Sequence, residues 1–254
     1  MPSAVARVGA VPEPREIQFR SDMTVELVRS SAHDSDVLFA ARVSTQGEKT
    51  LDAAQTGVEA SDRDRGLINY LMRDRHGSPF EHNSMTFYVQ APIFVFREFM
   101  RHRIASYNEE SGRYRELQPV FYVPGPERKL VQVGKAGAYE FLDGTPEQTA
   151  LAVEEGKAVA THAYESYQRM LEAGIAREVA RTVLPLSIYS SMYVTVNARS
   201  LMNFLSLRTK REDSHFPSFP QREIELVAEQ METFWAELMP LTHAAFEKNG
   251  RVAP

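Results

Sequence analysis

The residues of this 254-residue sequence that are best suited to chemistry lie between Arg97 and Arg115, in the run REFMRHRIASYNEESGRYR. Arg97 and Arg101 are four residues apart, so a helix would place both guanidinium groups on one face. Guanidinium forks, together with serine hydroxyls and the Asn108 amide, can bind a phosphate or pyrophosphate. The carboxylates that follow could hold ribose hydroxyls. Composition alone gives similar weight to a solvated, ion-paired helix end.

Several common catalytic patterns are absent from the sequence. It contains no G-x-G-x-x-G, no G-x-x-x-x-G-K-[ST] and no G-x-S-x-G, so neither usual glycine loop holds a nucleotide and no nucleophile elbow is present. It also contains no cysteine, which excludes disulfides, cysteinyl zinc sites, iron–sulfur clusters and a thiolate nucleophile.

One group of residues resembles a metal site. His76, Glu81 and His82 are close in sequence, but their spacing matches neither H-E-x-x-H nor H-x-x-E-H. We therefore expect two histidines in a turn and no metal ion.

Charge and hydropathy narrow the class of protein. The net charge of −5 argues against a general nucleic-acid binder, although a local basic pocket remains compatible with it. No apolar run reaches about 18 residues, and the proline-broken N-terminus lacks the apolar core of a secretory signal. We expect a cytoplasmic protein with no membrane and no nucleic-acid partner.

Hydrophobic periodicity predicts the elements that must position these residues. Strands are expected at 23–29, 84–90 and 188–196. Helices are expected at 34–43 (capped by Asp34 or Ser35), 61–74 (capped by Ser61), 92–103, 146–173, 177–184, 199–208 and 224–239. Polar or proline-rich segments predict loops at 46–61, 107–115, 120–144 and 212–221. We expect a loosely ordered leader over 1–22 and one domain over 23–250. Because helices and strands alternate irregularly, the predicted fold is α+β, a mixed sheet flanked by long helices.

The run Arg101-His102-Arg103-x-x-Ser106-x-Asn108-x-x-Ser111-x-Arg113 resembles a known family signature. It matches all seven fixed positions of R-H-R-x-x-S-x-N-x-x-S-x-R, which is typical of the flavin-dependent thymidylate synthases. Further segments resemble the family in the same order: SPFEH at 78–82, APIF at 91–94, ARTVLP at 180–185 and VNARSLMNF at 196–204. The resemblance spans about residues 23 to 247, without the leader and the loop near 126–146.

The resemblance implies a reaction. Members of the family methylate dUMP to dTMP with methylenetetrahydrofolate as carbon donor, and FAD reduced by NADPH carries the hydride. The missing cysteine agrees with this, because the other class of thymidylate synthase activates the pyrimidine with a thiolate. Stabilisation of charge on the uracil ring by a fixed arginine would replace that step.

The resemblance also assigns residues to dUMP. Arg208 matches the arginine beside the uracil ring and receives the catalytic role, although alone it would read as a cation at a helix C-terminus. The remaining positions that match dUMP contacts are Glu98, Arg101, Glu109, Ser111, Gly112, Arg113 and Arg181. Many relatives have glutamine where this chain has Glu98.

A second set of positions matches contacts to the cofactor. The residues that match FAD contacts are Ser78, Arg101, His102, Arg103, Glu109, Asn197, Ala198, Arg199 and Asn203. Ser78 stands where threonine is frequent, which keeps the hydroxyl. His76 matches a histidine near the flavin and folate, and His215 could match another, but the segment 209–220 looks longer than in many relatives. The resemblance further implies a homotetramer with active sites at subunit interfaces.

Two other functions are compatible with some of these residues. An arginine-rich pocket could bind RNA or a nucleotide without chemistry, although the net charge and the single tryptophan argue against RNA. A metal hydrolase could use His76, Glu81 and His82, although their spacing is poor. A flavin absorption band that NADPH bleaches would separate the first function from both.

Overall fold

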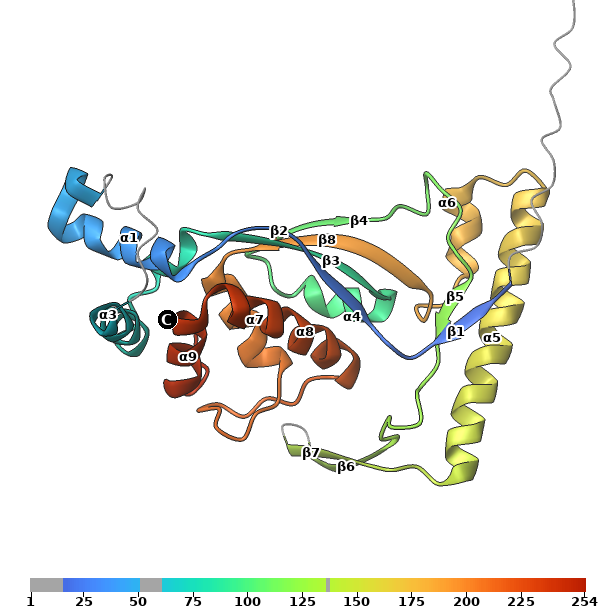
Figure 1. Cartoon of the computed structure of the whole chain (residues 1–254). Helices are drawn as coiled ribbons and strands as arrows, with labels where there is room; N and C mark the ends of the chain where they lie inside the picture. Colours follow the sequence, from blue (N-terminus) through green and yellow to red (C-terminus); the bar gives the residue numbers. More distant parts are fainter. Residues whose placement is uncertain (1–15, 51–60, 136–137) are drawn as a thin grey trace, which may run out of the picture.

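A computed structural model describes residues 16–50, 61–135 and 138–254 of the chain. Its centre is a four-stranded antiparallel sheet in the order β2-β3-β8-β4, with β2 at Thr24–Ser31, β3 at Ser84–Pro92, β8 at Tyr189–Val196 and β4 at Ser106–Glu109 (Figure 1). Side chains alternate across β3: Met85, Phe87 and Val89 are buried, and the residues between them are half-buried. This period of two sends one face of the sheet into the core.

Helices cover that apolar face. Figure 1 shows α4 (Ile93–Phe99), α7 (Ala198–Arg208) and α8 (Arg222–Leu238) together beneath the sheet, with α9 (Pro240–Lys248) beside them. Phe87, Phe96, Leu205 and Trp235 are among the fully buried side chains of the shared core. The signature residues therefore follow an element, α4, whose apolar side is fixed by burial.

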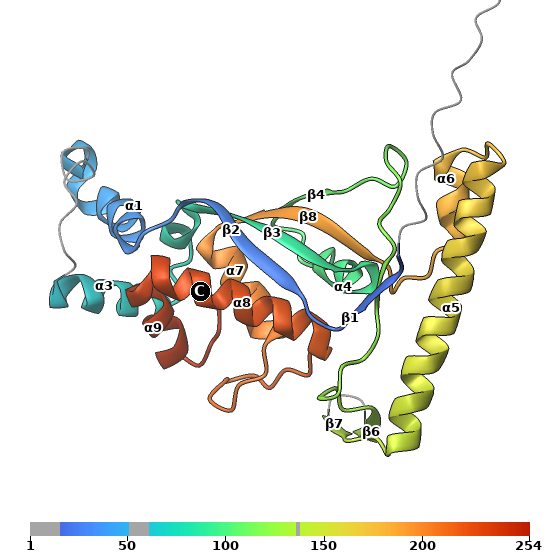
Figure 2. The ribbon, with the colours of Figure 1, turned by 45° about the vertical axis from the view of Figure 1, so that its right-hand side comes forward.

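Two further helices lie at one end of the sheet, and a long helix stands at the other (Figures 1 and 2). The first two are α1 (Asp34–Gln46) and α3 (Asp62–Arg73), and Ser61 caps α3 by accepting a hydrogen bond from the Asp64 backbone N–H. At the other end, α5 (Pro146–Glu172) packs with α6 (Arg177–Ala180) and β5 (Val120–Tyr122) around a smaller core that contains Phe121, Tyr164 and Tyr167. Short 3-10 turns occupy Gly47–Lys49, Ser78–Glu81 and Arg181–Val183.

Most predicted elements are confirmed, but the sheet differs from the expectation. All four strands of the main sheet are antiparallel, and the parallel pairing lies in a separate two-stranded unit of β1 (Gln18–Arg20) and β5. A leader that extends to residue 22 is therefore wrong for Gln18–Arg20; residues 1–15 and 51–60 lie outside the described residues. The predicted loop at 120–144 contains β5 and a hairpin of β6 (Val131–Lys135) and β7 (Ala138–Leu142). Because β6 and β7 are largely exposed and β5 has only three residues, these strands lack the extended apolar alternation that marks a strand.

Three local predictions are corrected around the helices. The N-cap of α1 is His33, not Asp34 or Ser35. The helix that begins after Pro92 ends at Phe99, so Arg97 and Arg101 do not share a helix face as expected. The segment after it, predicted irregular, includes β4, an edge strand whose exposed polar residues hide the strand pattern. Within the described residues, no helix combines the length and apolarity needed to span a membrane.

Candidate active site

Arg208 lies at the C-terminal end of α7. Its side chain is held by Glu98, in the last turn of α4, and by His102, in the turn that follows α4. Its Nε donates to His102 Nε2 at 3.0 Å, and its Nη1 donates to the Glu98 carboxylate at 2.5 Å. Its Nη2 lies 3.5 Å from the Glu98 carbonyl oxygen. The Arg208 side chain is 18% exposed, so one N–H on each terminal nitrogen remains for a ligand. The guanidinium is thus oriented before any substrate arrives.

Burial sets the protonation states of its two partners. Burial, and next the positive charge of Arg208, lower the pKa of His102 to about 4. His102 is therefore neutral at pH 7, with its proton on Nδ1, because Nε2 accepts from Arg208. Burial also raises the pKa of Glu98 by more than the attraction of Arg208 lowers it. The cluster at pH 7 contains one cation, one anion and one neutral ring.

Aromatic packing fixes this turn from below. Phe99 stacks on Phe204 of α7 with ring centroids 4.8 Å apart, and His102 packs edge-on against the same Phe204 ring at 4.9 Å. The Tyr107 hydroxyl lies 3.0 Å from the Phe99 carbonyl oxygen and 2.7 Å from that of His102. A side chain of β4 thereby satisfies the last carbonyl of α4 and the His102 carbonyl in the turn that follows, so the helix can end just before the signature without leaving these two carbonyls unpaired.

A second buried group near Glu98 was missed from the sequence. Glu223 of α8 accepts hydrogen bonds from the Tyr122 hydroxyl at 2.5 Å and from Arg128 Nε at 2.6 Å. Burial alone would raise the pKa of Glu223, but these donors lower it below its usual value, and its negative charge contributes to the raised pKa of Glu98. Tyr122 and Arg128 come from the segment predicted as a surface loop, so no sequence signal joined them to Glu223.

The residues expected to bind the dUMP phosphate gather at the far end of β4. Gly112 is buried, and a Cβ at this position would lie 3.1 Å from the Leu117 side chain and 3.3 Å from Arg181 Cδ. Arg113 forms an exposed ion pair with Glu178 of α6 at 3.0 Å, and the Ser111 hydroxyl accepts from the Arg113 backbone N–H. The structure thus brings Gly112 beside Arg181.

Glu109 is the last residue of β4 and precedes the segment 111–113. Its carboxylate accepts a hydrogen bond from Ser190 at 2.9 Å, and burial raises its pKa despite that bond and the attraction of Arg181. Arg101, Arg103 and Arg181 are exposed and form no ion pair within 4 Å in the parts of the chain that the structure covers. Unpaired guanidinium groups at a surface are suited to anionic ligands.

Some of the residues expected to contact FAD make hydrogen bonds that stabilise the fold, and others have exposed side chains. Asn197 caps α7 by accepting from the Ser200 backbone N–H at 2.8 Å, and the Ala198 N–H donates to Asn83. Asn203 donates to the Arg199 carbonyl oxygen. Asn197 therefore has a structural role at the start of α7, whereas the Asn203 side chain is exposed.

Arg199 packs against the turn that carries His76 and Ser78. Its Nε donates to the Pro254 carbonyl oxygen at 2.7 Å, and its Nη1 pairs with Glu81. A Cβ on Gly77 would lie 2.6 Å from Arg199 Nε, so the glycine permits this close packing beside His76 and Ser78. Both of those side chains are exposed, and His76 packs edge-on against Tyr70 at 5.5 Å.

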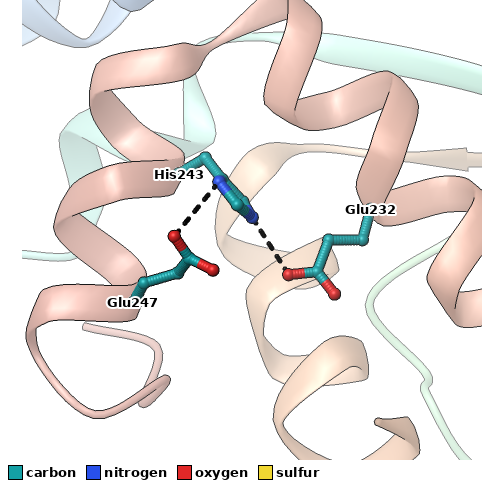
Figure 3. A group of neighbouring side chains, drawn as sticks. All are labelled: Glu232, His243 and Glu247. Atoms are coloured by element: carbon teal, nitrogen blue, oxygen red, sulfur yellow. Dashed lines mark hydrogen bonds and ion pairs between the residues drawn. The ribbon is translucent and has the colours of Figure 1, made fainter. Parts of the chain in front are cut away.

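The histidines proposed for other roles are placed separately. The backbone N–H of His215 donates to the Gly250 carbonyl, and its exposed ring packs on Phe216. His76, Glu81 and His82 do not form the metal-ligand group that the structure reveals. That group is Glu232, His243 and Glu247, whose ligand atoms lie within 4.8 Å of one another (Figure 3).

This group is an ion-pair network rather than a vacant metal site. His243 contacts both carboxylates, at 3.0 Å for Glu232 and 3.7 Å for Glu247 (Figure 3). Arg251, only 3% exposed, reaches both oxygens of Glu232 at 2.7 and 2.9 Å. The guanidinium already supplies the positive charge there, and it would repel a metal ion. The buried Trp235 packs edge-on against His243 at 5.2 Å.

Comparisons with known proteins place this geometry in a family. The family described as "Thymidylate synthase complementing protein" matches residues 26–241 of the chain. The chain belongs to this family. A protein of Streptomyces coelicolor named "Flavin-dependent thymidylate synthase" is 68% identical over 240 residues, which covers 94% of this chain and 96% of that protein. A protein of Tropheryma whipplei with the same name is 65% identical, over 93% and 97% of the two chains.

A solved structure also shares the fold. It is described as a UMP/dUMP methylase, PolB, from Streptomyces cacaoi, bound with 5-Br dUMP. It superposes with a TM-score of 0.88 at 57% sequence identity, over 94% of this chain and all of that one. The same methylase bound with 5-Br UMP gives a TM-score of 0.85 at 56% identity.

Proposed function

We propose that the chain methylates dUMP to dTMP reductively, with methylenetetrahydrofolate as carbon donor and FAD, reduced by NADPH, as hydride carrier. The observation that carries this proposal is the orientation of Arg208 by Glu98 and His102 in a chain without cysteine. A fixed cation beside the pyrimidine supplies the activation that a thiolate supplies elsewhere.

Arg208 is the proposed catalytic residue. Its two remaining N–H groups would hydrogen-bond to a carbonyl oxygen of uracil and, once the ring has lost its proton, to the ring nitrogen, where negative charge develops. A guanidinium that is already oriented and partly desolvated stabilises that charge without having to reorganise during the reaction. Glu98 already accepts from Nη1 of the Arg208 guanidinium, so the uracil ring would bind to the N–H groups that Glu98 leaves free.

The phosphate of dUMP would bind at the corner formed by 111–113 and Arg181. Gly112 has no Cβ to crowd Leu117 and Arg181, so Arg181 can lie close to this backbone, and Ser111 offers a hydroxyl. Arg101 and Arg181 have no ion-pair partner among the described residues, and Arg113 would exchange Glu178 for the phosphate. These cations bind a group that does not react, so they act on affinity rather than on the chemical step.

The donor set also fits a flavin dinucleotide. Arg101 and Arg103 would hold the pyrophosphate, and Ser78, His102, Glu109, Asn197, Ala198, Arg199 and Asn203 are the other proposed contacts. Free guanidinium groups are the chemistry that a pyrophosphate needs where no glycine loop exists. FAD supplies the hydride transfer. The exposed His76 would lie near the folate, and His215 is a second proposed residue of that side.

We propose that the complete site needs more than one subunit. No hydrogen bond or ion pair among the described residues joins the Arg208 cluster, the 111–113 corner and the Arg199 group. The long helix α5 carries exposed apolar side chains, with Leu151 60% and Val159 56% exposed. Burial of this helix between copies would assemble the three groups in a homotetramer. We place this nucleotide-methylating enzyme in the cytoplasm.

The test measures the flavin absorption band of the purified protein and the formation of dTMP. Purified protein is expected to bind FAD, show a flavin absorption band, and lose that band anaerobically with NADPH. Adding dUMP and methylenetetrahydrofolate should restore the band and yield dTMP. UMP should be offered in parallel, because the neighbouring structure is described as a UMP/dUMP methylase. A colourless protein that does not take up FAD would overturn the proposal.

A further inference from the structure

If uracil is activated as an anion, the proton on its ring nitrogen N3 must be transferred to a base. The neutral ring carries a hydrogen on N3, and Arg208 cannot accept it because a guanidinium is already protonated. In this chain two basic groups lie beside Arg208 and could accept it: the imidazole of His102 and the carboxylate of Glu98. The inference that follows rests on the function proposed above.

We propose that Glu98 is the general base that takes the N3 proton of the pyrimidine. One Glu98 oxygen, Oε2, accepts from Arg208, while Oε1 has no hydrogen-bond partner in the described part of the chain. The Glu98 side chain is 23% exposed, so Oε1 can be reached from the surface. Arg208 and Glu98 thus present an N–H donor and a carboxylate acceptor side by side, the pair that a C=O and an adjacent N–H of uracil require.

His102 is the weaker choice for geometric reasons. Its Nε2 lone pair already accepts from Arg208, and its other ring nitrogen must then carry the proton. Its depressed pKa, about 4, also makes it a poor proton acceptor. Glu98 differs on both counts, since it has a free oxygen and a pKa above the ordinary value.

The charges that face Glu98 come from three elements. Arg208 on α7 attracts its anionic form, and Glu223 on α8 repels it. Arg128 neutralises part of the Glu223 charge, and His102, on the turn after α4, is uncharged. Burial outweighs the attraction of Arg208, which makes Glu98 a stronger base than a free carboxylate.

The proposed step is balanced within the site. The N3–H bond breaks, the Glu98 Oε1–H bond forms, and the electron pair of the broken bond stays on the ring. The ring anion then faces Arg208, whose partner Glu98 has become neutral, so the cation is available to the ring. After methyl transfer the same proton returns from Glu98 to N3 of the product, and no net proton is consumed by Glu98.

Glu98→Gln tests the proposal because it keeps one oxygen acceptor for Arg208 but replaces the basic carboxylate by a neutral amide that cannot take the proton. The dUMP-dependent reoxidation of reduced flavin should slow about 10²-fold near pH 7, the lower range for loss of a general base. The deficit should narrow as the pH rises, because hydroxide then removes the N3 proton. The acid limb of the wild-type pH–rate profile should be missing in the variant.

Three controls separate this role from others. Glu237→Gln removes an exposed carboxylate of α8 that lies away from Arg208 in sequence and makes no hydrogen bond or ion pair with the cluster among the described residues, and it should leave the rate unchanged. Flavin reduction by NADPH and calorimetric dUMP affinity should stay near wild type in Glu98→Gln. A wild-type rate across the pH range, a deficit that pH does not change, or a large loss of dUMP affinity would each overturn the proposal. Failure of the wild-type chain to form dTMP would instead overturn the function proposed above.

Discussion

Two clusters in this molecule are built from the same three residue types and behave oppositely. Near the C-terminus, Glu232, His243 and Arg251 join α8, α9 and the chain that follows; at the signature, Glu98, His102 and Arg208 join α4 and α7. Burial by itself would raise the pKa of both glutamates. Hydrogen bonds from His243 and Arg251 nevertheless lower that of Glu232 to about 2, whereas that of Glu98 stays raised.

The number of donors explains the difference. Glu232 receives both terminal nitrogens of Arg251 and a histidine nitrogen, so both of its oxygens are satisfied. Glu98 receives one Arg208 nitrogen and keeps one oxygen free. A fully satisfied cluster gives rigidity, while a half-satisfied one retains capacity to bind or accept a proton. The comparison shows that residue type alone does not separate a structural cluster from a candidate site.

The largest expected effect is on the satisfied cluster. Arg251→Leu leaves Glu232 buried without its cationic partner, which should cost about 3–5 kcal/mol of unfolding free energy. Urea denaturation measures this loss. Arg73→Leu, which removes an exposed ion pair with Asp74, is the control and should have little effect. An unchanged midpoint in Arg251→Leu would contradict a stabilising role for the network.

Arg208→Ala should change catalysis rather than stability. Removing one oriented donor from a site of developing charge should lower kcat by about 10²–10³. Arg208→Lys should recover only part of this, because an ammonium cannot reproduce the planar fork. Anaerobic stopped-flow measures flavin reduction and reoxidation separately, and reduction by NADPH should persist. Normal reoxidation coupled to dTMP would remove the role proposed for Arg208.

Arg113→Ala, in contrast, should mainly raise KM for dUMP.

Arg103→Ala probes the exposed, unpaired arginines. If Arg103 holds the pyrophosphate, its loss should weaken FAD binding by about 1.5–3 kcal/mol, the range for a hydrogen bond to a charged group. Titration of apoprotein with FAD measures the change. Wild-type affinity in this variant would exclude Arg103 from the cofactor site.

As the pH falls, the free energy of unfolding should decrease first through protonation of His102 and then through protonation of Glu232. His102 has a folded pKa of about 4, below its value of 6.5 in the unfolded chain, so its contribution is complete above pH 6.5 and is lost as the pH falls to 4. Glu232 contributes fully above about 4.5 and loses its contribution as the pH falls toward 2. Melting temperatures from pH 7 to 3 should therefore fall earlier in wild type than in His102→Gln, which lacks the first titration. Coincident profiles would contradict the burial of a neutral His102.

Sequence reasoning predicted the regular elements because their patterns are strong. The strand at β3 and the helices α3, α5 and α8 have clear apolar periodicity, and Ser61 is a recognisable cap. It missed β4 and the β6–β7 hairpin because edge strands with polar residues show no alternation. For the site, the signature supplied the candidate residues, which stay predictions, and the pairing of Glu98 with Arg208 could be seen only in the folded chain. Tyr122, Arg128 and Glu223 meet from segments about 100 residues apart, which no local pattern shows.

The position of the single tryptophan has a practical consequence for spectroscopy. Trp235 is fully buried and its ring lies against His243 of the C-terminal network. Its fluorescence should therefore report on that network, whereas the flavin absorption band reports on the site. Fluorescence and absorbance recorded on one sample would show whether acid or denaturant releases the cofactor before the C-terminal helices separate.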